Sequence, residues 1–300
     1  MAGNSLTKAG KVFAVFLSLL CLSVLIKDTK FFKQMERFTK GFTIVEKMSA
    51  VQEQMDDLLK SYTGEDILCA FDIDGTLLQT DFPATYIPNI VQHMDVYRTL
   101  ARRYQQVDPT LACMYALKLP QRLVEKDSLK LIQHLKEKNI KTIAFTATLT
   151  GPFEEYQRAE NMRYAQLKQY GINFENTFTE KDFLLTNCPA YRSNYPSFYR
   201  GILFSNGEQG MATKGTVLCA FLKTIDWIPR CVVLIDDRVK NLDDVKKSLR
   251  AHYPQTQFVG IEYQGARYYC PQTVSAEAFE QFWSDCFQRA ARAINWQNKS

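Results

Sequence analysis

The chain has 300 residues, enough for one large domain or for one domain with a lid. Its composition is 46% hydrophobic and 23% charged, so it can bury a sizeable core, and this excludes a mostly disordered chain. The formal net charge of +5 is mild, and the basic residues are mixed with acids, so no nucleic-acid partner is expected.

The three histidines and eight cysteines show no spacing typical of a metal site, so acid–base chemistry is expected to fall to carboxylates or lysine. Four cysteines, Cys69, Cys219, Cys231 and Cys286, lie at apolar positions and are predicted to be buried free thiols. A disulfide that involves Cys188 or Cys270 stays open.

The first predicted element is an apolar run of 15 residues, 12–26, flanked by lysines. At about 1.5 Å per residue, a helix of this length falls short of a hydrocarbon core about 30 Å thick. The length suits a secretory signal, and an uncleaved anchor is the alternative. We therefore expect residues 1–27 to be a signal peptide or a membrane anchor. The protein would then be exported to the periplasm or beyond the cell, or tethered to the membrane through residues 12–26.

After this run, helical spacing of apolar residues alternates with short, wholly apolar segments typical of buried strands. Asn139 is expected to end one helix, and Ser275 to cap the start of another. Residues 182–200 are long for a loop, so they are interpreted as a functional flap or a hairpin. The predicted helices are 43–62, 91–106, 110–119, 127–139, 152–171, 214–225 and 275–296. The predicted strands are 67–71, 142–146, 172–178, 201–207, 230–237 and 257–265.

Strands of this kind, alternating with helices, predict a parallel sheet covered by helices on both faces. Ligands of such sheets bind beyond the carboxyl ends of the strands. In this sequence, polar residues stand at several such ends. They are Asp72 and Asp74 after strand 67–71, Thr146 at the end of strand 142–146, Asp236 and Asp237 at the end of strand 230–237, and Lys214 at the start of helix 214–225.

Each of these residues, taken alone, is ordinary for a turn, a strand end or a helix cap. Two carboxylates at the end of an apolar strand are nevertheless costly to bury. Alternation along an extended chain places Asp72 and Asp74 on the same side, where both can face one ligand. Together, the residues favour a reaction centre at one edge of the sheet.

The motifs "FDIDGTLL", "IAFTAT", "ATKGTVLCAFL" and "VVLIDDRVKNL" resemble, in this order, the four motifs of the haloacid dehalogenase (HAD) superfamily of phosphohydrolases. The resemblance covers about residues 66–265. The layout also resembles an uncharacterised bacterial HAD-like group with N-terminal signal segments. The resemblance implies an α/β fold, a Rossmann-like doubly wound parallel sheet with an inserted helical cap.

The expected organisation has four parts. They are a signal peptide or anchor at 1–27, an N-terminal helical segment at 28–62, a catalytic core at 63–78 and 127–300, and a helical cap insert at 79–126.

The resemblance implies that Asp72 is a nucleophile that forms an aspartyl phosphate, and that Asp74 is the general acid and base. Mg²⁺, which prefers oxygen ligands, would be bound by Asp72, Asp236, Asp237 and the backbone carbonyl of Asp74. Haloacid dehalogenases themselves lack the second acid, so the presence of Asp74 favours phosphate chemistry.

By the same resemblance, Thr146 and Lys214 would bind the phosphate oxygens, with Lys223 as the alternative lysine. Gly75 would permit close approach of the backbone to the phosphate. The expected function is a Mg²⁺-dependent phosphatase acting on a small phosphomonoester. The alternatives are a binding or effector protein on the same scaffold without turnover, and a phosphotransferase. The substrate and the oligomeric state stay open.

Overall fold

The computed structural model describes residues 41–207 and 212–297, without the side chains of 294–297. The chain divides into two compact units, Met1–Phe42 and Thr43–Ser300, and the fold below is that of the second unit. The expected signal peptide or anchor at 1–27, including the tether at 12–26, lies outside the described residues. Among the described residues, no helix is both long and apolar enough to cross a membrane.

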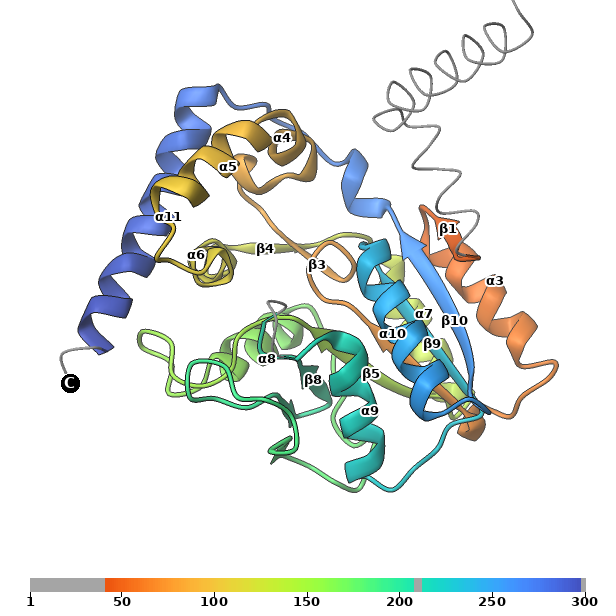
Figure 1. Cartoon of the computed structure of the whole chain (residues 1–300). Helices are drawn as coiled ribbons and strands as arrows, with labels where there is room; N and C mark the ends of the chain where they lie inside the picture. The colour runs from red at the N-terminus through yellow and green to blue at the C-terminus, as the bar shows by residue number, and fades with distance from the viewer. Residues whose placement is uncertain (1–40, 208–211, 298–300) are drawn as a thin grey trace, which may run out of the picture. The chain divides into compact units, whose positions relative to one another are not determined.

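A large sheet forms the centre of the Thr43–Ser300 unit (Figure 1). Its eight strands are β1 (Thr43–Val45), β2 (Ile67–Phe71), β5 (Lys141–Thr146), β6 (Phe183–Leu184), β7 (Ser197–Tyr199), β8 (Ile202–Phe204), β9 (Cys231–Asp236) and β10 (Gln257–Tyr263). The order is β1-β10-β9-β2-β5-β8-β7-β6, and all neighbours from β1 to β8 are parallel. This mostly parallel sheet, flanked by helices, confirms the predicted Rossmann-like α/β fold.

Helices cover both faces of the sheet because its strands are apolar on both sides. These helices are α3 (Met48–Leu58), α7 (Asp127–Glu137), α8 (Ala159–Gln169), α9 (Lys214–Thr224) and α10 (Val239–His252). Side chains of α3, α7 and α8 share one buried cluster with Cys69 and Phe71 of β2. Leu68 and Ala70 alternate to the opposite face, where α9 and α10 lie (Figure 1).

The insert between β2 and β5 was predicted to be wholly helical, and this is wrong at its two ends, where strands form. Its helices are α4 (Ile87–Gln92), α5 (Met94–Arg103) and α6 (Pro109–Leu117). They are bracketed by β3 (Leu78–Thr80) and β4 (Gln121–Leu123), which pair antiparallel with Leu78 opposite Leu123. We call α4–α6, together with β3 and β4, the cap. The two strands were not predicted from the sequence because each has only three residues.

The C-terminal helix α11 (Ala276–Gln297) was assigned by sequence to the core, but its buried face packs on the cap helices α5 and α6 (Figure 1). Phe279, Trp283 and Phe287 share a buried cluster with Leu100 and Met114 of the cap. The apolar face of this helix is therefore buried against the insert.

Two predicted helix limits are confirmed by backbone geometry. Asn139 follows α7 with a left-handed φ of 58°, a conformation common at helix C-termini. The Ser275 hydroxyl accepts a hydrogen bond from the Ala278 amide at 3.2 Å at the start of α11, as the N-cap prediction requires.

The predicted helix 43–62 is wrong at its beginning, where Thr43–Val45 forms β1 and pairs with β10. Ile44 and Val45 are β-branched, so an edge strand suits them, and Val45 is buried there. The helix itself begins at Met48. A strand of three residues is too short to be recognised in the sequence next to the helical pattern that follows it.

The predicted helix 152–171 is shorter than expected, since α8 begins only at Ala159. Phe153 and Tyr156 form a small backbone bridge, and Glu154 has a φ of 48°, which no right-handed helix accommodates.

The predicted strand at 172–178 is also wrong, because this segment is a series of turns. Its apolar residue Phe174 is buried instead beneath Gly201.

Residues 182–200 contribute β6 and β7 to one edge of the sheet, so the hairpin interpretation is confirmed. Arg200 and Gly201, both with positive φ, connect β7 to β8.

The seven cysteines of the described residues are all free, so the structure contains no disulfide at Cys188 or Cys270. The four thiols predicted to be buried are buried.

Candidate functional site

The strand order of the sheet reverses between β2 and β9. From β2 the chain continues through β5 to β8 on one side, and then returns to β9 and β10 on the other. Such a reversal, called a switch point, is where open α/β sheets bind ligands, beyond the carboxyl ends of the strands. Asp72 follows β2, and Asp236 and Asp237 lie at the end of β9. The prediction that acids of separate strands meet at one edge of the sheet is confirmed.

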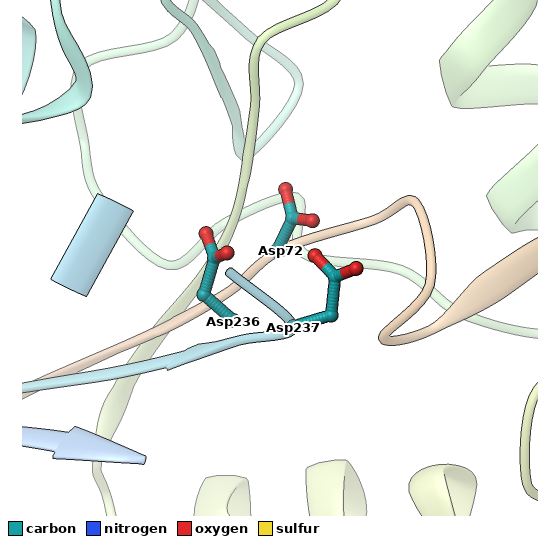
Figure 2. Close-up of side chains that lie close together, drawn as sticks. All are labelled: Asp72, Asp236 and Asp237. Atoms are coloured by element: carbon teal, nitrogen blue, oxygen red, sulfur yellow. The ribbon is translucent and has the colours of Figure 1, made fainter. Parts of the chain in front are cut away.

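The carboxylates of Asp72, Asp236 and Asp237 converge, as Figure 2 shows, and one oxygen of each lies within 4.8 Å of the others. The Asp72 amide donates a hydrogen bond to the Ile235 carbonyl at 2.8 Å, which fixes the two strand ends in register. Asp72 and Asp236 are buried, with 6% and 0% of their surface exposed. Three carboxylates at this spacing repel one another unless a cation lies among them.

Lys214, the first residue of α9, supplies a cation at this place. Its Nζ donates hydrogen bonds to Asp72 Oδ1 at 2.6 Å, Asp236 Oδ2 at 2.7 Å and the Phe145 carbonyl at 2.9 Å. Burial alone would lower the pKa of Lys214, but the two carboxylates outweigh burial and leave the pKa raised. Lys223, the alternative lysine, is exposed in the last turn of α9, so Lys214 is the lysine that belongs to the site.

Asp236 is held by two further donors that the sequence analysis missed. The Arg238 amide donates to Oδ1 at 2.9 Å, and the Asn241 side-chain amide donates to both carboxylate oxygens at 3.0 Å. Asn241 lies five residues after Asp236 in the first turn of α10. An amide at that spacing after a strand-end acid was the signal that could have identified it.

The pKa values of Asp72 and Asp237 are both raised at this site. Burial raises the pKa of Asp237 to about 7, and the neighbouring Asp236 adds to the rise. Burial also raises the pKa of Asp72 well above its usual range, with Lys214 opposing the rise and the other carboxylates adding to it. One oxygen of Asp237, Oδ1, is buried with no hydrogen-bond partner. An oxygen-only donor set with one unused buried oxygen fits a hard divalent cation.

The turn after β2 brings Gly75 against Asp237. Gly75 has a φ of 79°, and a Cβ at this position would lie 2.9 Å from Asp237 Oδ2. Its amide donates to the Leu78 carbonyl at 2.8 Å. Gly75 therefore lets the turn lie close to Asp237, and its N–H is already used within the turn. The approach of its backbone to a phosphate stays a prediction.

Asp74 lies outside the three-carboxylate cluster. Its side chain is 38% exposed and forms an ion pair with Arg163 of α8, with Arg163 Nη2 and Asp74 Oδ1 2.5 Å apart. Arg163 was not predicted from the sequence, because it stands in an ordinary helical pattern with no local signal.

Thr146 ends β5 as predicted, but its hydroxyl is fully buried and lies 2.8 Å from the hydroxyl of Thr148. The Thr148 amide also donates to the Thr146 hydroxyl at 3.1 Å. Thr148, which was not predicted from the sequence, borders the pocket described below, whereas Thr146 does not and contacts Thr148 through these hydrogen bonds.

Of these residues, Asp72, Asp74, Asp237, Lys214 and Thr148 border a pocket of about 490 Å³ between the sheet edge and the cap. We call Asp72, Asp236, Asp237 and Lys214 the site floor. The opposite wall, which we call the roof, is mostly apolar. It contains Ile87, Ile90, Cys113, Met114 and Leu117 of the cap, and Trp283 of α11. A ligand here would meet charge at one end and apolar surface at the other.

The molecule is thus an α/β protein with a Rossmann-like sheet, an inserted cap and a buried site of acids and lysine at the switch point. The chain belongs to the family described as "Protein of unknown function (DUF2608)", which matches residues 44–298. An uncharacterised protein of Rickettsia bellii is 23% identical over 221 residues, which are 71% of this chain and 73% of that protein. An uncharacterised protein of Rickettsia typhi is 26% identical over 215 residues, or 68% and 70% of the two chains.

Proposed function

We propose that the protein is a Mg²⁺-dependent phosphatase that hydrolyses a small phosphomonoester through an aspartyl phosphate on Asp72. One observation carries the proposal: three carboxylates and a buried lysine meet at the switch point of the sheet, at the charged end of a capped pocket. The motif order, with a second acid at Asp74, supports phosphate chemistry over dehalogenation.

The carboxylates of Asp72, Asp236 and Asp237 would hold the metal ion, since their oxygens converge and Asp237 Oδ1 has no other partner. When bound, Mg²⁺ supplies positive charge that neutralises the phosphoryl oxygens and the surrounding carboxylates. Lys214 keeps a second positive charge within hydrogen-bonding distance of Asp72. Thr148 borders the pocket, and its hydroxyl would bind a phosphoryl oxygen there.

In the first step an oxygen of Asp72 attacks phosphorus, the bond to the ester oxygen breaks, and Asp74 gives its proton to the departing alkoxide. In the second step Asp74 takes a proton from water, and the resulting hydroxide attacks the phosphorus of the aspartyl phosphate. Inorganic phosphate leaves, and the Asp72 carboxylate and the proton on Asp74 are restored. Asp72 and Asp74 both border the pocket, as these two reaction steps require.

The test is phosphate release by the purified protein from a broad panel of phosphomonoesters with Mg²⁺ present. Wild type is expected to hydrolyse some members of the panel, and Asp72→Asn is expected to lose at least about 10³-fold in rate. Asp226→Asn is the matched control. Asp226 is exposed, and its φ of 50° suits asparagine equally well. No release by wild type from any ester would refute the proposal.

A further inference from the structure

The charge of Arg163 is buried with one acidic partner. Its side chain is fully inaccessible, and its ion pair with Asp74 is the one salt bridge it forms within the described residues. Its Nε is buried with no hydrogen-bond partner. A guanidinium does not lose its proton in a protein, and burying such a charge costs free energy that one ion pair rarely recovers. Apolar replacements of buried ion pairs are often nearly neutral for stability, so stability alone does not account for the arginine.

A chain of hydrogen bonds continues from Arg163 to the cap. Arg163 Nη1 donates to Gln166 Oε1 at 2.6 Å, and Gln166 Nε2 donates to the Leu117 carbonyl at 2.6 Å. Leu117 is the last residue of α6 and borders the same pocket as Asp74. The carboxylate of Asp74 is therefore connected, through two side chains of α8, to the end of a cap helix.

The side chain of Asp74 needs such a fixed partner. It is 38% exposed on a turn, where an unpaired carboxylate samples several rotamers. Proton transfer is efficient only from a group held within hydrogen-bonding distance of the reacting atoms. The bond that Arg163 donates to Asp74 selects one orientation of the carboxylate, and the bond that Arg163 donates to Gln166 fixes the arginine in turn.

We propose that Arg163 is a positioning residue that holds the Asp74 carboxylate for proton transfer, with Gln166 coupling that orientation to the cap. The inference rests on the phosphatase function proposed above. It adds a residue that lies outside the four sequence motifs. Arg163 borders no part of the pocket and acts only through Asp74.

The test uses the full chain, Mg²⁺ and 4-nitrophenyl phosphate, whose leaving group departs without a proton. In Arg163→Met, attack by Asp72 is expected to persist, while hydrolysis of the aspartyl phosphate slows because Asp74 no longer orients water. Rapid mixing should then show a burst of about one nitrophenolate per enzyme, followed by a steady rate at least about tenfold below wild type. Arg163→Lys, which keeps the charge, should recover part of that rate.

Gln166→Leu should lower the steady rate less than Arg163→Met does, because Asp74 keeps its direct partner. Arg230→Met is the control. This arginine pairs with Asp66 at the opposite end of β9, and its loss should change neither phase. Asp72→Asn should abolish the burst.

A purely structural role of Arg163 would lower the burst amplitude and the steady rate together, and that result would overturn the inference. An Arg163→Met protein with the steady rate of wild type would do the same. If wild type releases no product from any phosphomonoester, the proposed function itself fails, so the two failures are distinguishable.

Discussion

The site floor and the roof of the pocket are built in opposite ways. The floor comes from the ends of neighbouring strands and the start of one helix, and its side chains are fixed by charge and hydrogen bonds. The roof comes from the cap and α11, two segments far apart in the chain, and is held by apolar packing. The floor therefore follows from local sequence motifs, whereas the roof depends on long-range contacts that no motif records. Substitutions in each region test whether the two are as independent as this contrast implies.

The largest effect is expected at the floor. Lys214→Met removes the cation that bonds both Asp72 and Asp236, and leaves buried carboxylates facing one another. Breaking a buried ion pair in this way costs about 3–5 kcal/mol of unfolding free energy. Urea unfolding without divalent metal measures the loss. Lys223→Met, exposed on the same helix, should change the free energy by no more than about 0.5 kcal/mol. A Lys214→Met protein as stable as wild type would contradict the assigned charge balance.

At the roof, Trp283→Ala is expected to cost about 3 kcal/mol, because it leaves a cavity in the cluster shared by the cap and α11. The indole also donates to the Ala84 carbonyl at 3.1 Å. If floor and roof are independent, Mg²⁺ binding measured by calorimetry should stay as in wild type, while the Michaelis constant for substrate rises.

Trp283→Phe keeps most of the packing and loses the hydrogen bond, so it should cost about 1 kcal/mol. A fall in Mg²⁺ affinity in Trp283→Ala would show that the roof also shapes the floor, and the contrast between the two regions would break.

Asp74 and Arg163 join the two regions, and their substitutions should be unequal. Asp74→Asn leaves a buried guanidinium without its counter-charge and is expected to cost about 2 kcal/mol, discounted because Asp74 reaches solvent. Arg163→Met leaves a carboxylate that water can solvate, so its cost should be smaller. Unfolding of both variants by urea decides the order, and a larger loss for Arg163→Met would contradict it.

How much of the structure could be predicted from the sequence also differs between the site floor and the roof. β2, β5, β9 and β10 were visible because a short, wholly apolar run bounded by polar residues is typical of a buried strand. Lys214 was identified because it begins a helix at the expected place in the motif order. All of these signals lie within a few consecutive residues, where the apolar pattern directly reflects burial.

Arg163 and the packing of α11 could not be predicted, for a physical reason. The arginine is recognisable only once α8 is placed beside the turn that carries Asp74, 89 residues earlier in the chain. The apolar stripe of α11 showed that it would be buried but not which surface would bury it. Periodicity records the existence of a buried face, whereas the identity of its partner depends on the tertiary fold.

The smallest effect separates backbone strain from a direct contact within the floor. Gly75 and Gly171 have nearly the same φ, 79° and 76°, but a Cβ at Gly75 lies 2.9 Å from Asp237 Oδ2, while at Gly171 it meets nothing within 4 Å. Both alanine substitutions should cost about 1 kcal/mol through the left-handed backbone. Only Gly75→Ala should also displace Asp237 and weaken Mg²⁺ binding in calorimetry. Equal Mg²⁺ affinity in the two variants would mean that Asp237 is not a ligand, and that Asp72 and Asp236 alone bind the metal.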